Sequence, residues 1–213
     1  MIDFILFGTI AYLLGSIPSA VWIGKTWNGI DVREHGSKNA GATNTFRVLG
    51  KKAGITVLII DILKGFLAVS MPVIFFMCGY FLTHSISNDQ IIYMQILGAF
   101  AAVLGHVFPI FANFKGGKGV ATSLGVIIGI HPPAALICLL LFIVVFISFN
   151  FVSLGAICAS LAFPSVLIFV FEVKNNWLIL FSVILSSIVI IAHKKNIVRL
   201  IKGEESKMKL FRK

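Results

Sequence analysis

Long apolar runs separated by short polar stretches dominate the chain. A helix that spans a membrane needs about 20 apolar residues, within a range of about 17–25. The pattern predicts seven apolar helices, at Phe4–Gly24, Ala53–Leu82, Ile91–Asn113, 119–131, 133–149, 152–171 and Trp177–Ala192. We therefore expect an all-α polytopic membrane protein with a bundle of about seven transmembrane helices.

The number of spans is least defined between Gly119 and Phe171. This stretch is apolar with weak interruptions, of which His131-Pro132-Pro133 is the strongest because proline ends helices. A five-span arrangement fits the loop charges as well as a seven-span one. No polar linker divides the chain, so we expect a single integral-membrane domain over residues 1–213.

The composition agrees with a lipid environment. The chain is 58% hydrophobic and 12% charged, whereas a soluble domain is about 45–50% apolar and about 25% charged. So few charges do not cover a soluble surface of this size. The N-terminal apolar run precedes the first basic residue, Lys25, which is the reverse of a secretory signal, so we expect it to remain as a transmembrane helix.

The net charge of +10 is distributed asymmetrically among the predicted loops. Sixteen of the 18 basic residues lie in the stretch from Lys25 to Lys52, in the tetrad Lys115–Lys118 or in the tail from Lys194. Basic loops remain on the cytoplasmic side of a membrane. We therefore expect the N-terminus outside and the C-terminus in the cytoplasm, and we interpret the charge as membrane orientation, with no nucleic-acid partner.

Two polar clusters in these loops carry candidate chemistry. The first runs from Gly36 to Asn44, where small residues let a backbone approach a ligand, and is followed by Arg47, whose guanidinium suits a phosphate. The second, from Lys115 to Lys118, precedes an apolar helix whose first N–H groups attract anions. An ordinary loop and a flexible turn are the respective alternatives.

A third cluster opens the tail, where His193, Asn196 and Arg199 share a helical face by their spacing. A basic helix lying on anionic headgroups is the alternative. Asp61 and Lys64 lie three residues apart inside a predicted span, where charges are costly and often functional; a structural ion pair is the alternative. These residues suit either an enzyme that joins a phosphorylated substrate to a lipid or a transporter or flippase for a phosphorylated organic anion.

The same clusters resemble a known family. The residues concerned are Gly15-Ser16-Ile17-Pro18, Gly36-Ser37-x-Asn39-x-Gly41-Ala42-Thr43-Asn44, Asp61-x-x-Lys64-Gly65, Gly105-His106-x-Phe108-Pro109, Lys115-Gly116-Gly117-Lys118-Gly119-Val120-Ala121-Thr122, and His193-x-x-Asn196-Ile197-x-Arg199-Leu200 with Gly203-x-Glu205. In this order they are similar to the three signature regions of the bacterial acyl-phosphate:glycerol-3-phosphate acyltransferase (PlsY) family. One departure is that Asn150 and Phe151 replace an arginine–aromatic pair that usually precedes the position of Ser153.

The resemblance implies a reaction and its setting. A fatty acyl group passes from acyl phosphate to the 1-hydroxyl of glycerol 3-phosphate, which gives lysophosphatidic acid and inorganic phosphate, the first step of phospholipid synthesis. No cofactor is implied: no metal, no nucleotide and no coenzyme A donor. The implied partners are acyl phosphate, glycerol 3-phosphate, membrane lipids and an enzyme that forms acyl phosphate. The implied location is the bacterial cytoplasmic (inner) membrane, with the active site facing the cytoplasm.

The resemblance also implies roles for individual residues. Catalytic roles are expected for Ser37, Lys118, His193 and Asn196. Substrate-binding roles are expected for Asn39, Gly41, Thr43, Asn44, Arg47, Lys64, His106, Gly116, Gly117, Gly119, Ser153 and Arg199. The Gly116-Gly117 turn is assigned to a phosphate and Lys118 to the charge of the departing phosphate. Either His193 or a phosphate oxygen of the substrate takes the hydroxyl proton.

Overall fold

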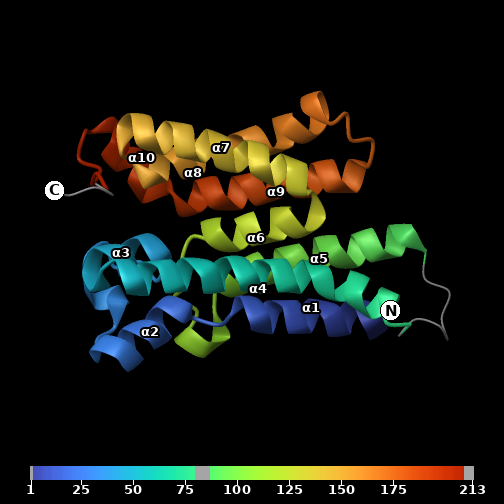
Figure 1. The fold of residues 1–213 in the computed structure, drawn as a ribbon, viewed down its shortest axis with the longest axis horizontal. Helices are drawn as coiled ribbons and strands as arrows, with labels where there is room; N and C mark the ends of the chain where they lie inside the picture. The colour runs from blue at the N-terminus through green and yellow to red at the C-terminus, as the bar shows by residue number, and fades with distance from the viewer. Residues whose placement is uncertain (1, 80–86, 209–213) are drawn as a thin grey trace. The chain divides into compact units, whose positions relative to one another are not determined.

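The computed structural model describes residues 2–79 and 87–208, and the regular structure in these ranges is helical (Figure 1). The chain divides into two compact units, Met1–Ile130 and His131–Lys213, and each is described by itself. His84 and the predicted end of the second span at Leu82 lie outside the described residues. That one acyltransferase domain comprises both units stays a prediction.

The first unit is built around one long helix. Its helices are α1 (Ile2–Gly15), α2 (Ser19–Asn28), α3 (Ala42–Leu49), α4 (Lys51–Met77), α5 (Asn88–Val107) and α6 (Val120–Ile130), with the short 3-10 helices η1 (Val32–Glu34) and η2 (Ile110–Ala112). Helix α4 packs against α1, α3, α5 and α6, and α2 and α3 gather at the end of the unit away from the N-terminus (Figure 1). The polar loops of this unit therefore meet at one end of an apolar bundle.

Small residues let these helices approach closely. A Cβ on Gly65 of α4 would collide with the carbonyl oxygen of Thr122, and one on Gly125 of α6 would collide with that of Ile62. Helices in a membrane gain little from the hydrophobic effect between themselves, so such small residues at the contact allow the van der Waals packing that holds them together. The close packing of α4 on α6 therefore requires glycine at positions 65 and 125.

The first predicted span contains a break that the apolar pattern does not show. Helix α1 ends at Gly15 and α2 begins at Ser19, with Pro18 between them. Proline has no N–H to donate and disfavours a helical conformation in the preceding residue. Ile17, which precedes the proline, lies outside both helices, and its carbonyl oxygen accepts hydrogen bonds from the Ser19 N–H at 3.0 Å and from Lys64 Nζ at 2.8 Å.

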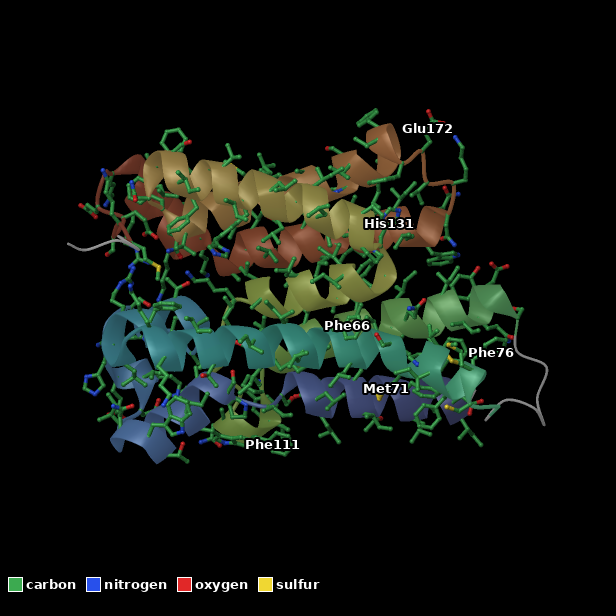
Figure 2. The ribbon with its side chains drawn as sticks, in the orientation of Figure 1. Phe66, Met71, Phe76, Phe111, His131 and Glu172 are labelled. Carbon is green, nitrogen blue, oxygen red and sulfur yellow. The ribbon has the colours of Figure 1, made fainter. Side chains whose placement is uncertain are left out.

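In the second unit, each long helix packs against the next one along the chain. It contains α7 (Pro132–Phe149), α8 (Val152–Ser165), the short π-helix η3 (Val166–Val170), α9 (Asn176–Ala192) and α10 (Lys194–Ile201), in which α7 packs on α8 and α8 on α9. His131 caps α7 by accepting a bond from the Ala134 N–H at 3.2 Å, and Figure 2 shows it at the same end of this unit as Glu172. The tail folds back, since the N–H of Met208 donates to the carbonyl of Asn150 at 2.9 Å.

The helices carry the apolar surface expected of membrane spans. Large side chains are exposed along them, for example Ile59 at 51% on α4 and Ile147 at 68% on α7. Five described helical segments are long and apolar enough to cross a membrane, among them Ile2–Asn28, which joins α1 and α2, and Val152–Val170, which joins α8 and η3. A sixth is added if α9 and α10, which meet at a 61° bend, form one broken span. Helix α6 has 11 residues, or about 16 Å of length against a hydrocarbon core of about 30 Å. The count of seven spans stays a prediction.

Candidate functional site

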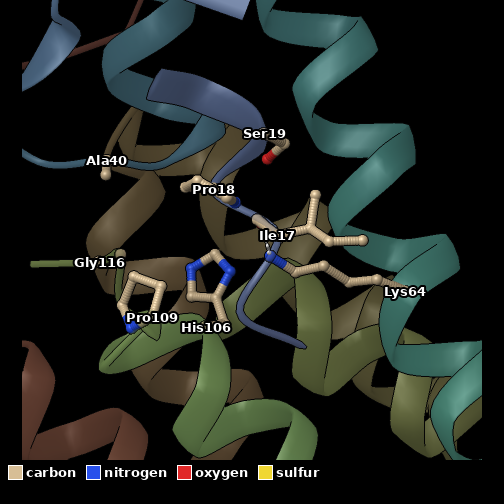
Figure 3. Close-up of a pocket in the computed structure, with 9 residues that line it drawn as sticks. Ile17, Pro18, Ser19, Ala40, Lys64, His106, Pro109 and Gly116 are labelled. Carbon is tan, nitrogen blue, oxygen red and sulfur yellow. Dashed lines mark hydrogen bonds between the residues drawn. The ribbon is translucent and has the colours of Figure 1, made fainter. Parts of the chain in front are cut away.

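A narrow pocket lies in the first unit where its polar loops meet (Figure 3). It is lined by Ile17, Pro18, Ser19, Ala40, Lys64, His106, Pro109, Gly116 and Gly117. Four of these, Lys64, His106, Gly116 and Gly117, were predicted to bind substrate, and they come from α4, α5 and the loop before α6. The pocket has room for little more than one water molecule.

A buried cluster of charge forms one wall of the pocket. Asp61 Oδ1 accepts hydrogen bonds from Ser19 Oγ at 2.7 Å and pairs with Lys64 Nζ at 2.9 Å, and both charged side chains are at most 4% exposed. The structural ion pair between Asp61 and Lys64 is thus confirmed. Charges this deep are expensive unless they neutralise each other, and Lys64 uses two of its three donors on Asp61 and Ile17.

His106 connects the charge cluster to the glycines. Its Nδ1 lies 3.6 Å from Asp61 Oδ1, which is beyond hydrogen-bond range, while a Cβ on Gly117 would touch its Nε2. The N–H groups of Gly117 and Gly116 donate to the carbonyls of His106 and Val107 at 3.1 and 3.2 Å. The assignment of this turn to a phosphate expects these two N–H groups to face the ligand, but in the structure they close the loop on itself. Glycine is required at both positions because a side chain would collide with His106.

The first polar loop is organised around Asn44. This side chain is 1% exposed, accepts a bond from the Ser37 N–H at 2.8 Å and donates to the carbonyls of Val32 and His35. Its amide therefore shapes the loop that presents Ser37, which is exposed. The remaining residues predicted in or after this loop are Asn39 in the loop, Gly41 capping α3, and Thr43 and Arg47 on α3, with Arg47 exposed.

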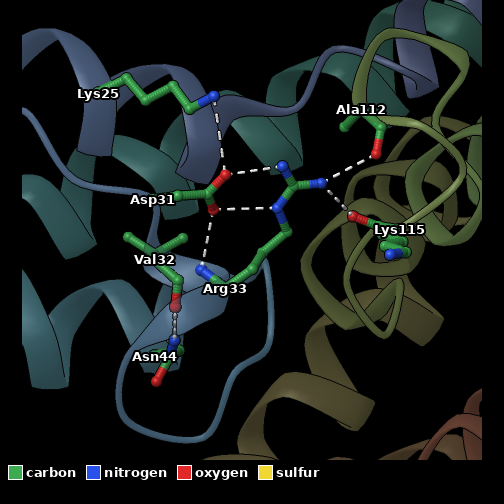
Figure 4. A network of polar contacts seen from close by, with 7 residues as sticks. All are labelled: Lys25, Asp31, Val32, Arg33, Asn44, Ala112 and Lys115. Atoms are coloured by element: carbon green, nitrogen blue, oxygen red, sulfur yellow. Dashed lines mark hydrogen bonds and ion pairs between the residues drawn. The ribbon is translucent and has the colours of Figure 1, made fainter.

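A network of polar contacts joins the first loop to the loop before α6 (Figure 4). Arg33 pairs with Asp31 through Nη2 at 2.7 Å and Nε at 3.0 Å, and its Nη1 donates to the carbonyl of Ala112 at 2.9 Å. These hydrogen bonds lower the pKa of Asp31 to about 2 and raise that of Arg33. Lys118 and Gly119 follow this junction directly, and Gly119 has a left-handed φ of +82° before α6 begins at Val120.

In the second unit, predicted residues meet at one carboxylate. Glu205 Oε1 accepts bonds from Ser153 Oγ at 2.7 Å and from Asn196 Nδ2 at 2.6 Å, and its Oε2 lies 3.0 Å from Arg199 Nε. This supports the predicted shared face of Asn196 and Arg199. The ring of His193 turns back instead, with Nδ1 2.8 Å from the carbonyl of Val189. A carbonyl only accepts, so Nδ1 carries a proton, and in the neutral form of the ring the lone pair lies on Nε2.

The departure at Asn150 and Phe151 is also explained by the second unit. Asn150 adopts a left-handed conformation, with φ of +61°, at the end of α7. Lys207 Nζ lies 5.6 Å from the centre of the Phe151 ring, within the range of a cation–π contact. A cation from the tail therefore reaches this position although the expected arginine is absent from it.

Three elements of these sites had not been predicted from the sequence. Pro18 and Glu205 enter the sequence analysis only as members of motifs and Ser19 only as the residue after one. The pair Asp31 and Arg33 is given no role there. The sequence does carry a signal for Asp31 and Arg33, because they are opposite charges two residues apart in a loop of a chain with few charges.

Among residues 2–79 and 87–208, no group of three or more His, Cys, Asp or Glu side chains is placed to hold a metal ion.

The fold and the site define a multi-pass integral membrane protein with a polar site at one end of an apolar bundle. The model of the glycerol-3-phosphate acyltransferase family matches residues 5–203. The chain therefore belongs to the glycerol-3-phosphate acyltransferase family.

Individual relatives agree with this assignment over their whole lengths. The chain is 46% identical to a glycerol-3-phosphate acyltransferase of Fusobacterium nucleatum over 97% of this chain and 98% of that one. It is 39% identical to one of Chlorobaculum tepidum, with full coverage of both. Crystal structures of PlsY, an integral membrane glycerol 3-phosphate acyltransferase, in glycerol 3-phosphate and lysophosphatidic acid forms match with TM-scores of 0.82 and 0.80. They are 34% and 33% identical, with 97% of this chain and 96% of each covered.

Proposed function

We propose that the protein transfers a fatty acyl group from acyl phosphate to the 1-hydroxyl of glycerol 3-phosphate and releases lysophosphatidic acid and inorganic phosphate. Family membership supports the acceptor, and the PlsY relatives were solved in forms with glycerol 3-phosphate and lysophosphatidic acid. The observation that carries the proposal is the meeting of Lys64, His106 and the Gly116-Gly117 turn at one pocket. The acyl-phosphate donor rests on the motif resemblance.

The reaction asks the protein mainly for positioning and charge. The 1-hydroxyl oxygen bonds to the acyl carbonyl carbon, and the bond from that carbon to the phosphate oxygen breaks with its electron pair on the phosphate. The hydroxyl proton passes to a base or to the departing phosphate. An acyl phosphate is already activated, so orientation and stabilisation of the developing negative charge are the main contributions required.

In the first unit, we assign a phosphate to the mouth of the pocket rather than its interior, because the interior holds little more than a water molecule. Lys118 and Gly119 follow the lining residue Gly117 in the sequence and lead into α6, and the start of a helix favours an anion. Lys118 offsets charge on the departing phosphate. Ser37 and Arg47 are the acceptor-binding residues proposed from the first loop and α3.

In the second unit, we assign Ser153, Asn196 and Arg199 to substrate binding through the arrangement that Glu205 holds. His193 in its neutral form has a lone pair at Nε2, which suits either a base or a hydrogen-bond acceptor for the substrate hydroxyl. A phosphate oxygen of the substrate is the alternative base. These roles require residues of both units to act on the same substrates, so they depend on the prediction that the two units form one domain.

The sequence motif of another acyltransferase family bears on whether coenzyme A could carry the acyl group. Acyltransferases of another family use a His-x4-Asp pair, and this spacing occurs once here, at His84 and Asp89. Asp89 lies in the first turn of α5, 17 residues or about 25 Å along the helix from His106 at the pocket. Asp89 is therefore remote from the polar site of this unit, which favours acyl phosphate as the donor.

The proposed setting is the bacterial cytoplasmic membrane, with seven spans, the N-terminus outside and the polar sites facing the cytoplasm. The first polar loop and the loop before α6, which both carry basic residues, lie together because Arg33 contacts the carbonyls of Ala112 and Lys115, and this supports the orientation (Figure 4). The membrane provides the lipid partners, and a separate enzyme forms the acyl phosphate.

The deciding experiment uses purified protein with palmitoyl phosphate and glycerol 3-phosphate. We expect phosphate release that depends on both substrates and lysophosphatidic acid in equal amount by mass spectrometry. Equal rates with palmitoyl coenzyme A would overturn the donor assignment. Uptake of glycerol 3-phosphate into proteoliposomes without acyl transfer would establish the transporter alternative instead.

A further inference from the structure

The loop that brings the two glycines to the pocket contains an unusual backbone. Asn113 and Phe114 have consecutive positive φ angles of +54° and +57°. Asparagine tolerates this left-handed region, but a bulky residue such as phenylalanine rarely adopts it. Phe114 is 57% exposed, so packing of its ring inside the protein does not enforce the conformation.

Hydrogen bonds on both sides of the turn enforce its left-handed conformation. Arg33 Nη1 donates to the carbonyl of Ala112 at 2.9 Å and has a longer contact with that of Lys115 at 3.4 Å. These two carbonyls flank Asn113 and Phe114 in the sequence. Strained backbone persists only where its surroundings over-determine it, and one guanidinium group contacts the chain at both ends of the strained pair.

The guanidinium is itself held in place. Asp31 binds it through two oxygens at 2.7 and 3.0 Å, and the side chains of Arg33 and Asp31 are 22% and 12% exposed. The hydrogen bonds from Arg33 lower the pKa of Asp31 to about 2, so its carboxylate keeps its charge, and its hold on the guanidinium, into the acid range. The other cation near Asp31 is Lys25 at 3.8 Å, whose side chain is 59% exposed.

We propose that Arg33, oriented by Asp31, is a positioning residue that fixes the strained turn Asn113–Phe114 and thereby sets the Gly116-Gly117 segment against His106. The planar fork of arginine is required, since one edge is used on the carboxylate while a nitrogen remains for the carbonyls. The catalytic consequence rests on the proposed function, whereas the backbone consequence does not.

The first test measures the stability of the backbone hydrogen bonds and does not depend on enzymatic activity. Hydrogen exchange by mass spectrometry on peptides covering 108–120 compares the wild type with Arg33→Ala, Arg33→Lys and Lys25→Ala. Loss of a charge-assisted bond predicts exchange faster by about 10-fold or more at the Gly116 and Gly117 amides in both Arg33 variants. Lys25→Ala, which removes the exposed cation near the same carboxylate, is expected to match the wild type. Unchanged exchange in Arg33→Lys, or an equal rise in Lys25→Ala, would overturn the proposal.

The second test asks whether strain is what Arg33 restrains. Phe114→Gly and Phe114→Ala both remove the ring, but only glycine relieves the cost of a positive φ. In the Arg33→Ala background, we expect Phe114→Gly to restore slow exchange at Gly116 and Gly117 and Phe114→Ala not to restore it. Where Arg33→Ala does not accumulate in membranes, Arg33→Lys is the background. Equal effects of the two Phe114 variants would refute the strain argument.

Kinetics then connect the loop to catalysis. A misplaced phosphate-binding loop weakens ground-state and transition-state binding together, so KM should rise by about 10-fold in Arg33→Lys while kcat is kept. A purely structural loss would instead reduce the amount of active enzyme and lower apparent kcat at unchanged KM, and that result would contradict positioning. A wild type without acyltransferase activity would refute the proposed function but leave the exchange tests standing.

Discussion

At the residue scale, the role of His193 is the sharpest open question of the proposed mechanism. A positioned general base contributes about 10²–10⁴-fold to the rate. Because Nδ1 donates to the Val189 carbonyl, the lone pair of the neutral ring lies on Nε2, the atom that would act as a base or as a hydrogen-bond acceptor. We favour positioning, since the substrate brings its own phosphate as a base.

The expected outcome for His193→Gln is therefore a higher KM with a largely retained kcat and a pH–rate profile of unchanged shape. Steady-state kinetics across pH, with both substrates varied, measure this. A loss in kcat above about 10³-fold at constant KM, with one limb of the pH profile removed, would instead identify His193 as the base.

Glu205 gives a second prediction at this scale. Its carboxylate serves Ser153, Asn196 and Arg199 at once, whereas a glutamine has one acceptor oxygen and turns an N–H₂ group towards a donor. We expect Glu205→Gln to lose stability by about 1.5–3 kcal/mol, as for a lost bond to a charged group. A thermal melt in detergent should show a lower Tm than for Glu204→Gln, whose site is exposed. Equal melting of the two variants would mean that the cluster contributes little to folding.

At the element scale, the loop before α6 shows how far sequence patterns reach. The apolar runs located α6, α7 and α9 to within one residue at each end and the start of α4 to within two residues, because each must bury or expose apolar surface along its whole length. The pattern did not reveal the break at Pro18 or helix α3, since a proline within an apolar run and a short helix in a polar loop barely change the hydropathy. Nor did it show that the glycine N–H groups are used within the loop, which depends on carbonyls about ten residues earlier that only the folded loop brings near.

The same loop yields a prediction with a defined steric cause. In Gly117→Ala, the new Cβ would press on His106 Nε2 and lie 3.0 Å from the carbonyl of Ala40, so the turn and the ring must move apart. We expect kcat/KM to fall on the order of 10–150-fold, equivalent to about 1.5–3 kcal/mol, while membrane insertion is kept. Gly8→Ala is the control, because its Cβ would meet only the Leu97 side chain. Unchanged kinetics in Gly117→Ala would remove this turn from the site.

At the scale of the whole molecule, membrane orientation governs whether the proposed chemistry is possible. The proposed reaction takes place on the cytoplasmic side, so every loop assigned to its substrates must face that side. The sequence predicts this from its charges, because moving basic loops across a membrane is unfavourable. Sequence alone does not decide the number of spans, since α6 with its 11 residues is apolar enough for a span but shorter than the hydrocarbon core.

Cysteine accessibility tests orientation and count together. In a background with Cys78, Cys138 and Cys158 replaced, single cysteines are placed at Lys38, Lys118, Lys174 and Lys202, and intact cells are treated with a membrane-impermeant maleimide. We expect labelling at position 174 only, with the other three labelled after the cells are opened. In the described chain, Lys174 lies in the exposed turn between η3 and α9, so a failure to label it from outside would argue for a five-span arrangement. Labelling of position 118 from outside would place the glycine loop on the wrong side for its substrates and would overturn both the topology and the proposed site.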